Sequence, residues 1–171
     1  MKSITIVGAS PFLEKVKDKL TNPLICINKT LKDFPSAEYF IYTDSGNAKL
    51  YKLFYKNQIV VTQKQNKYEV ENILKAKSYI LYEPVDKIEK CLIRLAGSHN
   101  TATFAIGLAY SLGYEEVILA GIDGDFEKGY YNGDLPKYCQ DESVNAMRYW
   151  INEYSKVIKI TNLNVESKMK G

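Results

Sequence analysis

Residues 98–125, which read SHNTATFAIGLAYSLGYEEVILAGIDGD, contain the pattern that decides the fold of this chain. A polar cap opens the stretch, and the apolar run that follows over residues 101–112 has the length of a helix. After a glycine turn, the apolar and β-branched residues 116–120 predict a buried strand. A helix that leads directly into a buried strand is typical of a parallel α/β sheet.

Short apolar runs and helical stretches alternate in the same way along the rest of the chain. We predict further strands over residues 3–7, 24–27, 39–42, 58–62, 78–82 and 157–161, and further helices over residues 12–20, 47–55, 68–76 and 142–154. Residues 85–95 fit either type of element, and residues 126–139 read as a loop rich in tyrosine and glycine. The expected fold is α/β: a single Rossmann-like, three-layer domain over residues 1–171, with a mainly parallel sheet.

The length, composition and net charge of the chain limit the class of protein to which it can belong. Its 171 residues, 46% hydrophobic and 25% charged, suit one globular domain with a real core. The net charge is +3, and the basic residues are scattered among acidic ones, so the charge does not indicate nucleic-acid binding. No window reaches the roughly 18 apolar residues of a membrane span. Cys26, Cys91 and Cys139 have neither zinc nor disulfide spacing, which favours a reducing, cytoplasmic location.

Polar side chains follow several of the predicted strands. In a parallel sheet these strand ends share one edge, where ligands bind, and the residues expected there are Gly8, Ser10, Asn28, Thr43, Asp44 and Asp123. Asn100 and Thr101 open the long helix at the same edge, and a helix N-terminus favours phosphate. We therefore predict that the small-molecule ligand is a nucleotide or a nucleotide conjugate.

Each feature also has an ordinary structural explanation. Residues 8–11 can be a simple turn without a binding role, in which Ser10 caps the next helix. They lack the G-x-G-x-x-G pattern of dinucleotide-binding enzymes. Asn100 can simply cap its helix, and Asp123 can belong to an Asx-Gly turn. Asp123 and Asp125 could instead hold a hydrated Mg²⁺ between them.

Two further features lie beside this segment. Residues 124–141 could form a short lid over a site, with Tyr130 as a candidate substrate contact and Asp134 as another carboxylate. His99 is the single histidine of the chain, and lone histidines are most often structural or solvated.

Taken together, the motifs resemble those of the bacterial sialyltransferases of glycosyltransferase family 42. The likeness lies in Gly8-Ala9-Ser10-Pro11, in Asn28, and in the run from Asn100-Thr101-Ala102 to Gly121-Ile122-Asp123. The layout is also similar to that of the archaeal 6-hydroxymethylpterin diphosphokinases, which use ATP.

The sialyltransferase resemblance implies a cytidine-nucleotide sugar as donor, with the polar pair before the long helix near its phosphate. It implies donor contacts at Gly8, Ser10, Asn28, Thr43, Asn100, Thr101, Gly121 and Asp123. Three features differ from the family: Ala9 stands where the family has an asparagine, Thr101-Ala102 stands in place of a Ser-Gly pair, and no histidine follows Asp123 where the family has a catalytic one.

The first hypothesis is therefore a nucleotide-dependent transferase, specifically a nucleotide-sugar glycosyltransferase, with Asp123 and Asp125 as the candidate catalytic carboxylates. An ATP-dependent pyrophosphokinase stays open, in which the two aspartates would hold Mg²⁺. A non-catalytic module that binds or sequesters a nucleotide stays open as well. The acceptor, the catalytic base and the oligomeric state are left open by the sequence.

Overall fold

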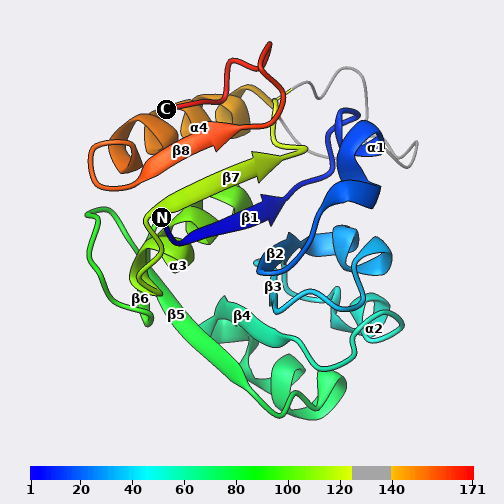
Figure 1. Ribbon diagram of the computed structural model, residues 1–171. Coiled ribbons are helices and arrows are strands. Elements are labelled where there is room, and N and C mark those ends of the chain that lie inside the picture. The colour runs from blue at the N-terminus through cyan, green and yellow to red at the C-terminus, as the bar shows by residue number, and fades with distance from the viewer. Residues whose placement is uncertain (125–139) are drawn as a thin grey trace.

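A computed structural model of the chain describes residues 1–124 and 140–171. These residues contain one sheet of eight strands in the order β6-β5-β4-β3-β2-β1-β7-β8, and every neighbouring pair is parallel (Figure 1). The strands are β1 (Ser3–Val7), β2 (Leu24–Ile27), β3 (Tyr39–Ile41), β4 (Ile59–Gln63), β5 (Tyr79–Val85), β6 (Arg94–Ala96), β7 (Glu116–Ala120) and β8 (Lys159–Asn162). The predicted α/β fold with a Rossmann-like sheet is confirmed.

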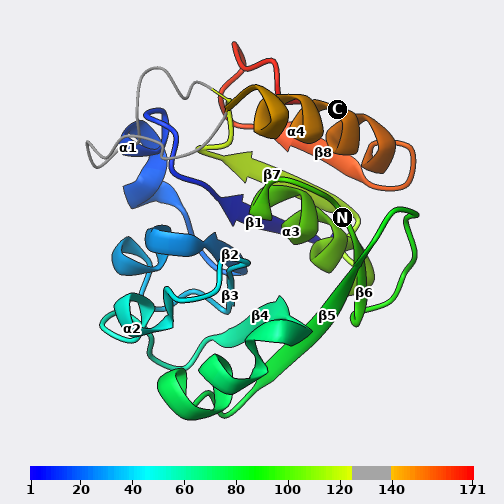
Figure 2. The same ribbon diagram turned by 180° about the vertical axis from the view of Figure 1, so that it is seen from behind.

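Helices cover both faces of this sheet (Figure 2). The α-helices are α1 (Leu13–Val16), α2 (Ala48–Tyr51), α3 (Thr101–Ser111) and α4 (Gln140–Tyr154). Shorter elements are the 3₁₀ turns η1 (Lys17–Lys19), η2 (Asn28–Asp33) and η3 (Lys64–Asn66) and the π-helical turn η4 (Glu69–Leu74). None of the helices described is both long and apolar enough to cross a bilayer.

The side-chain alternation of β1 shows how the two layers of core arise. Ile4 and Ile6 belong to the apolar cluster that includes α3 and α4, whereas Val7 packs with Leu13 of α1 on the opposite face. Successive residues of a strand point to opposite faces, so a strand covered on both faces is apolar throughout. This is why the central strands appear in the sequence as continuous apolar runs.

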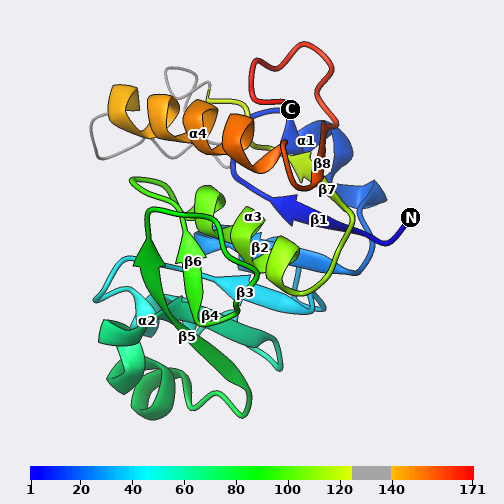
Figure 3. The same cartoon turned by 90° about the vertical axis from the view of Figure 1, so that its left-hand side faces the viewer.

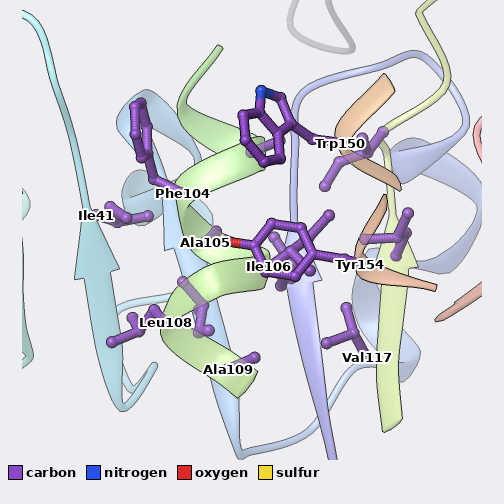
Figure 4. Packing of buried hydrophobic residues seen from close by; sticks show 14 of the residues in the cluster. Ile41, Phe104, Ala105, Ile106, Leu108, Ala109, Val117, Trp150 and Tyr154 are labelled. Atoms are coloured by element: carbon purple, nitrogen blue, oxygen red, sulfur yellow. The ribbon is translucent and has the colours of Figure 1, made fainter. Parts of the chain in front are cut away.

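Helix α3 is enclosed rather than laid on the surface. Nine of its eleven residues are buried, which explains a sequence that is apolar on all sides. The strands β5 and β6 stand beside it, and α4 packs against it as well (Figure 3). Tyr154 of α4 reaches past α3, with its ring among the core residues (Figure 4), and its hydroxyl donates a 2.6 Å hydrogen bond to the Ala96 carbonyl. A methyl group added at Gly107 would overlap that hydroxyl, so glycine lets α3 and α4 approach closely.

The boundaries of three strands match the sequence prediction to the residue: Ser3–Val7, Leu24–Ile27 and Glu116–Ala120. The helices predicted over residues 12–20 and 47–55 are wrong in extent, because regular α-helix covers only four residues in each. The ambiguous residues 85–95 contain the end of β5, a turn and the start of β6. The predicted loop over residues 126–139 lies outside the described residues.

Candidate functional site

The strand order reverses between β1 and β7, which are neighbours in the sheet but far apart in the chain. In open α/β sheets, ligands bind outside the carboxyl ends of the strands at such a switch point. The loop after β1 and the loop after β7 meet there. The amide of Gly8 donates to the Ala120 carbonyl at 2.8 Å, and the amide of Ser10 donates to the Gly121 carbonyl at 2.8 Å.

The contact between these two loops depends on glycine. Gly121 has a φ of +76°, and a Cβ atom there would overlap the carbonyl oxygen of Gly8. A Cβ atom at Gly8 would in turn lie 2.5 Å from the side chain of Ile122. Both glycines named by the sequence analysis therefore bring two backbone loops together at the switch point.

Asp123 is a buried polar group at this edge. The residue is only 6% exposed, and Oδ2 accepts a 2.6 Å hydrogen bond from the Ser10 hydroxyl. Oδ1 is buried and has no hydrogen-bond partner among the described residues. An unsatisfied buried acceptor costs about 1–3 kcal/mol, so a ligand that donates a hydrogen bond to Oδ1 would recover that free energy.

The prediction that Ser10 caps the following helix is wrong. Helix α1 begins after Phe12, and no side chain caps its N-terminus. The hydroxyl of Ser10 binds Asp123 instead, because the close approach of the two loops places a buried carboxylate within its reach.

Asn28 follows β2, the strand on the other side of β1. Its φ of +52° lies in the left-handed region, which asparagine tolerates better than most residues. Its side-chain oxygen is also buried without a hydrogen-bond partner in the described part of the chain. Two unsatisfied acceptors, one on Asn28 and one on Asp123, therefore follow the two strands that flank β1.

Thr43 and Thr101 come together at the start of α3. Their hydroxyl oxygens lie 2.9 Å apart, and Thr101 is buried while Thr43 is half-buried. Asp44, predicted as a neighbour of the same site, is exposed. Tyr51 has a raised pKa because it is buried and, to a smaller extent, because the charge of Asp44 is near. Tyr51 packs in the apolar cluster on the α2 side of the sheet.

Asn100 caps α3, which is the structural role that the sequence analysis offered beside a role in ligand binding. Its Oδ1 accepts a 2.8 Å hydrogen bond from the Ala102 amide, and its Nδ2 donates to the Ser143 hydroxyl at 2.6 Å. The side chain thus ties the first turn of α3 to the first turn of α4. Nothing in the sequence marked Ser143 as a partner, because the contact spans 43 residues.

The residues just before Asn100 make two more contacts with α4. The hydroxyl of Ser98 accepts a 3.0 Å hydrogen bond from the Trp150 indole. His99, with a φ of +54°, is 60% exposed, and its Nδ1 lies 3.8 Å from a carboxylate oxygen of Glu142. The exposed position of His99 at the surface of this loop fits a solvated histidine better than a catalytic one.

Some of the predicted site residues cannot be placed. Asp125, Tyr130 and Asp134 lie outside the described residues, as does most of the proposed lid over residues 124–141. Within residues 1–124 and 140–171, no three His, Cys, Asp or Glu side chains converge on a point that could hold a metal ion. Of the predicted magnesium site at Asp123 and Asp125, only Asp123 lies in the described part of the chain, and no metal cluster is found around it there.

Cys26, on β2, is not a nucleophile in this fold. It is fully buried, and burial raises the pKa of its thiol to about 12. The thiolate, which is the reactive form, is therefore absent at neutral pH.

No family model matches the chain, and no curated protein matches its sequence. Several solved structures match its fold. The sialyltransferase CstII in complex with a trisaccharide acceptor and CMP is 15% identical with a TM-score of 0.58, and the match covers 99% of this chain and 85% of that one. CstII from Campylobacter jejuni in complex with CMP is 16% identical with a TM-score of 0.58, over 100% of this chain and 84% of that one.

An α-2,3-sialyltransferase from Campylobacter jejuni in apo form is 13% identical with a TM-score of 0.54, over 98% of this chain and 77% of that one. The chain has the sialyltransferase fold. Its motifs predicted this likeness, and the structure confirms it at the level of fold. The sialyltransferase matches lend no support to the similarity with 6-hydroxymethylpterin diphosphokinases.

Proposed function

We propose that this protein is a nucleotide-sugar-dependent transferase whose donor binds at the switch point between β1 and β7. The observation that carries the proposal is the buried, unsatisfied Oδ1 of Asp123 beside Gly8. A buried acceptor without a partner at the carboxyl edge of a parallel sheet is where a ligand is expected to donate a hydrogen bond.

The chemistry of the flanking residues orients such a donor. Asp123 and Asn28 both offer oxygen acceptors, which suit ribose hydroxyls or an exocyclic amino group of a base. A carboxylate repels phosphate, so the phosphate belongs away from Asp123. The first turn of α3, with Thr101 and Thr43 side by side, provides hydroxyl donors and the positive end of a helix dipole.

Several solved sialyltransferase structures with this fold contain CMP, and one contains CMP-3FNeuAc. CMP is therefore the first nucleotide to test. In the proposed reaction, an acceptor hydroxyl oxygen bonds to the anomeric carbon as the carbon–oxygen bond to phosphate breaks. The hydroxyl proton passes to a base, and the nucleotide leaves with the phosphate.

The test is a thermal-shift titration with CMP and CMP-sugars, followed by chromatography of the products. Ligand at about 100 times its dissociation constant should stabilise the fold by about 2.7 kcal/mol. Asp123→Asn, which keeps the volume of the side chain, should lose most of this shift. Asp18→Asn, an exposed change of the same kind on η1, should keep it. If no nucleotide raises the Tm of the wild-type protein, the proposal is wrong.

A second candidate function is a binding module that holds a nucleotide without turning it over. The absence of any histidine after Asp123 favours this reading, because the family that the motifs resemble has its catalytic histidine there. Incubation with a CMP-sugar separates the two functions. A transferase slowly hydrolyses its donor when water replaces the acceptor, whereas a binding module returns it unchanged.

A further inference from the structure

The chain after β8 comes back to the loop that carries Asp123. Asn162 is the last residue of β8, which pairs with β7. Beyond it, residues 163–171, here called the return segment, form a loop at the tip of the strand and turn back toward α4 (Figure 1). A Cβ atom built at Gly171 would lie 3.0 Å from the Cβ atom of Ser155, just past the end of α4. The return segment is therefore folded against the domain.

Asn162 joins the return segment to the loop after β7. The residue is 6% exposed, and its Nδ2 donates to two backbone carbonyls, that of Ile122 at 2.9 Å and that of Met169 at 2.7 Å. Its Oδ1 accepts a 2.9 Å hydrogen bond from the amide of Asn164. Both N–H donors of the side chain are thus used, one on each segment, so its amide is held in one orientation.

The carbonyl of Ile122 belongs to the peptide group that precedes Asp123. A peptide group is planar, so a bond that holds its oxygen also restricts the amide nitrogen of Asp123 and the direction in which the side chain leaves the backbone. At the other end of that side chain, the Ser10 hydroxyl donates to Oδ2 at 2.6 Å. Asp123 is therefore held at its backbone from β8 and at its carboxylate from the loop after β1. Together the two bonds determine where Oδ1 lies.

The loop after β7 depends on such contacts to keep its position. It lies between Gly121 and Gly124, with φ angles of +76° and +73°, and glycine moves in that region with little steric restriction. A Cβ atom built at Gly124 would lie 2.7 Å from Cε of Met169, which is buried. The return segment thus holds this loop at two points, through the hydrogen bonds of Asn162 and through the packing of Met169.

The position of Oδ1 matters for binding because a hydrogen bond weakens steeply when its donor and acceptor are misaligned. We propose that Asn162 is a positioning residue of the donor site, which acts on the nucleotide through Asp123 and does not itself touch the ligand; this rests on the proposed function. The return segment then supports the site from the β8 side, as the loop after β1 supports it from the other.

The first measurement is the affinity for CMP, by calorimetry at a temperature well below the Tm of every variant. Asn162→Ala removes both donated hydrogen bonds and should raise the dissociation constant for CMP about tenfold. Gln58→Ala is the matched control. Gln58 is also buried and donates to a backbone carbonyl, that of Pro35 at 2.6 Å, but it lies before β4, at the edge of the sheet opposite the site. The control should lower the Tm and leave the dissociation constant within about twofold.

A double variant shows whether Asn162 acts through Asp123. In a protein that already carries Asp123→Asn, the change Asn162→Ala should alter the remaining CMP affinity by less than about twofold, because the carboxylate that it positions is gone. A full tenfold loss in that background would overturn the proposal, since Asn162 would then act on the ligand by another route.

The second measurement uses the wild-type protein alone, so it does not depend on the folding of any variant. Exchange of the Asn162 side-chain N–H protons with solvent, followed by NMR, reports the opening of its hydrogen bonds. If this opening releases Asp123, CMP at about 100 times its dissociation constant should slow the exchange by up to about 100-fold. The side-chain N–H protons of Gln58 are the internal control and should exchange equally fast with and without CMP.

The outcomes separate this inference from the proposed function. A wild-type protein that does not bind CMP overturns the donor site proposed for CMP, and the positioning role with it. CMP binding with an unchanged dissociation constant in Asn162→Ala overturns the positioning role alone, as does equal slowing of exchange at Asn162 and Gln58. Loss of affinity in Asn162→Ala but not in Gln58→Ala, with slower exchange at Asn162 only, supports it.

Discussion

The hydroxyl of Ser10 and the carboxylate of Asp123 are joined by a 2.6 Å hydrogen bond, although 113 residues separate them in the chain. The bond connects the loop after β1 with the loop after β7 and fixes the orientation of the Asp123 carboxylate. The second oxygen of that carboxylate, Oδ1, is left buried without a partner in the described part of the chain. The geometry of the proposed donor site therefore starts from this pair.

Removal of one member of this pair should destabilise the protein more than removal of both. Ser10→Ala leaves the buried carboxylate of Asp123 without its donor, at a cost of about 1–3 kcal/mol. The double variant with Asp123→Ala removes the unsatisfied group as well. We expect a coupling energy of about 0.5–3 kcal/mol in a double-mutant cycle followed by urea unfolding. Additive changes would show that the hydrogen bond contributes nothing to stability.

Asn28→Gly should separate binding from folding. Glycine adopts the φ of +52° at this position easily, so the free energy of unfolding should change by less than about 1 kcal/mol. Loss of the side-chain acceptor should weaken CMP binding by about threefold to tenfold, measured by calorimetry.

The matched control for Asn28→Gly is Lys75→Gly. Lys75 has nearly the same backbone conformation, with a φ of +54°, but it lies exposed at the end of η4. The control should keep the CMP affinity of the wild type. If both variants bind CMP equally well, Asn28 has no role in the donor site.

Gly107→Ala should strongly destabilise the protein, because the added methyl group overlaps the Tyr154 hydroxyl. Overpacking of this kind costs about 1–3 kcal/mol. Tyr154→Phe in the same protein removes the overlapping oxygen and should recover part of the loss, although the Ala96 carbonyl then loses its 2.6 Å donor. Thermal unfolding of the two single variants and the double variant checks the expectation, and it is contradicted if the second substitution brings no recovery.

Stability should fall as the pH rises above about 8.5, the ordinary pKa of a cysteine thiol. Burial raises the pKa of Cys26 to about 12, so between these values the unfolded chain releases a proton that the folded protein retains. The folded state binds more protons in this window, and each such group lowers the free energy of unfolding by up to about 1.4 kcal/mol per pH unit.

Buried tyrosines act in the same direction at higher pH. Burial raises the pKa of Tyr82 and Tyr154, whose hydroxyls stay protonated in the fold. Urea unfolding at several pH values between 8 and 10 isolates the cysteine, because tyrosine titrates above about 10 in the unfolded chain. Cys26→Ala should flatten the decline in that range, and an unchanged slope would exclude Cys26 as its source.

Elements with a strong local pattern could be predicted from the sequence. The strand Glu116–Ala120 is a short apolar run between a glycine turn and a polar loop, and the structure places it on the residues expected. The strand Arg94–Ala96 was ambiguous, because it is three residues long and its apolar neighbours fit a helix equally well. Its position is decided by pairing with β5 and by the hydrogen bond from Tyr154 to Ala96.

The candidate site also has one part that could be predicted from the sequence and one part that could not. Gly8, Asn28 and Asp123 could be named in advance because parallel strands bring their carboxyl ends to one edge, and a strand end is a local property of the chain. The hydrogen-bond partner of each side chain could not be named. Ser10 was expected to cap a helix and instead donates a hydrogen bond to Asp123. The side-chain amide of Asn100 donates a hydrogen bond to the hydroxyl of Ser143.

The sequence determined which residues end the strands, because apolar periodicity acts over a few neighbours. Only the tertiary structure decided which polar atoms of the described residues are satisfied and which are buried without a partner, because those contacts join segments that meet only after the sheet has formed.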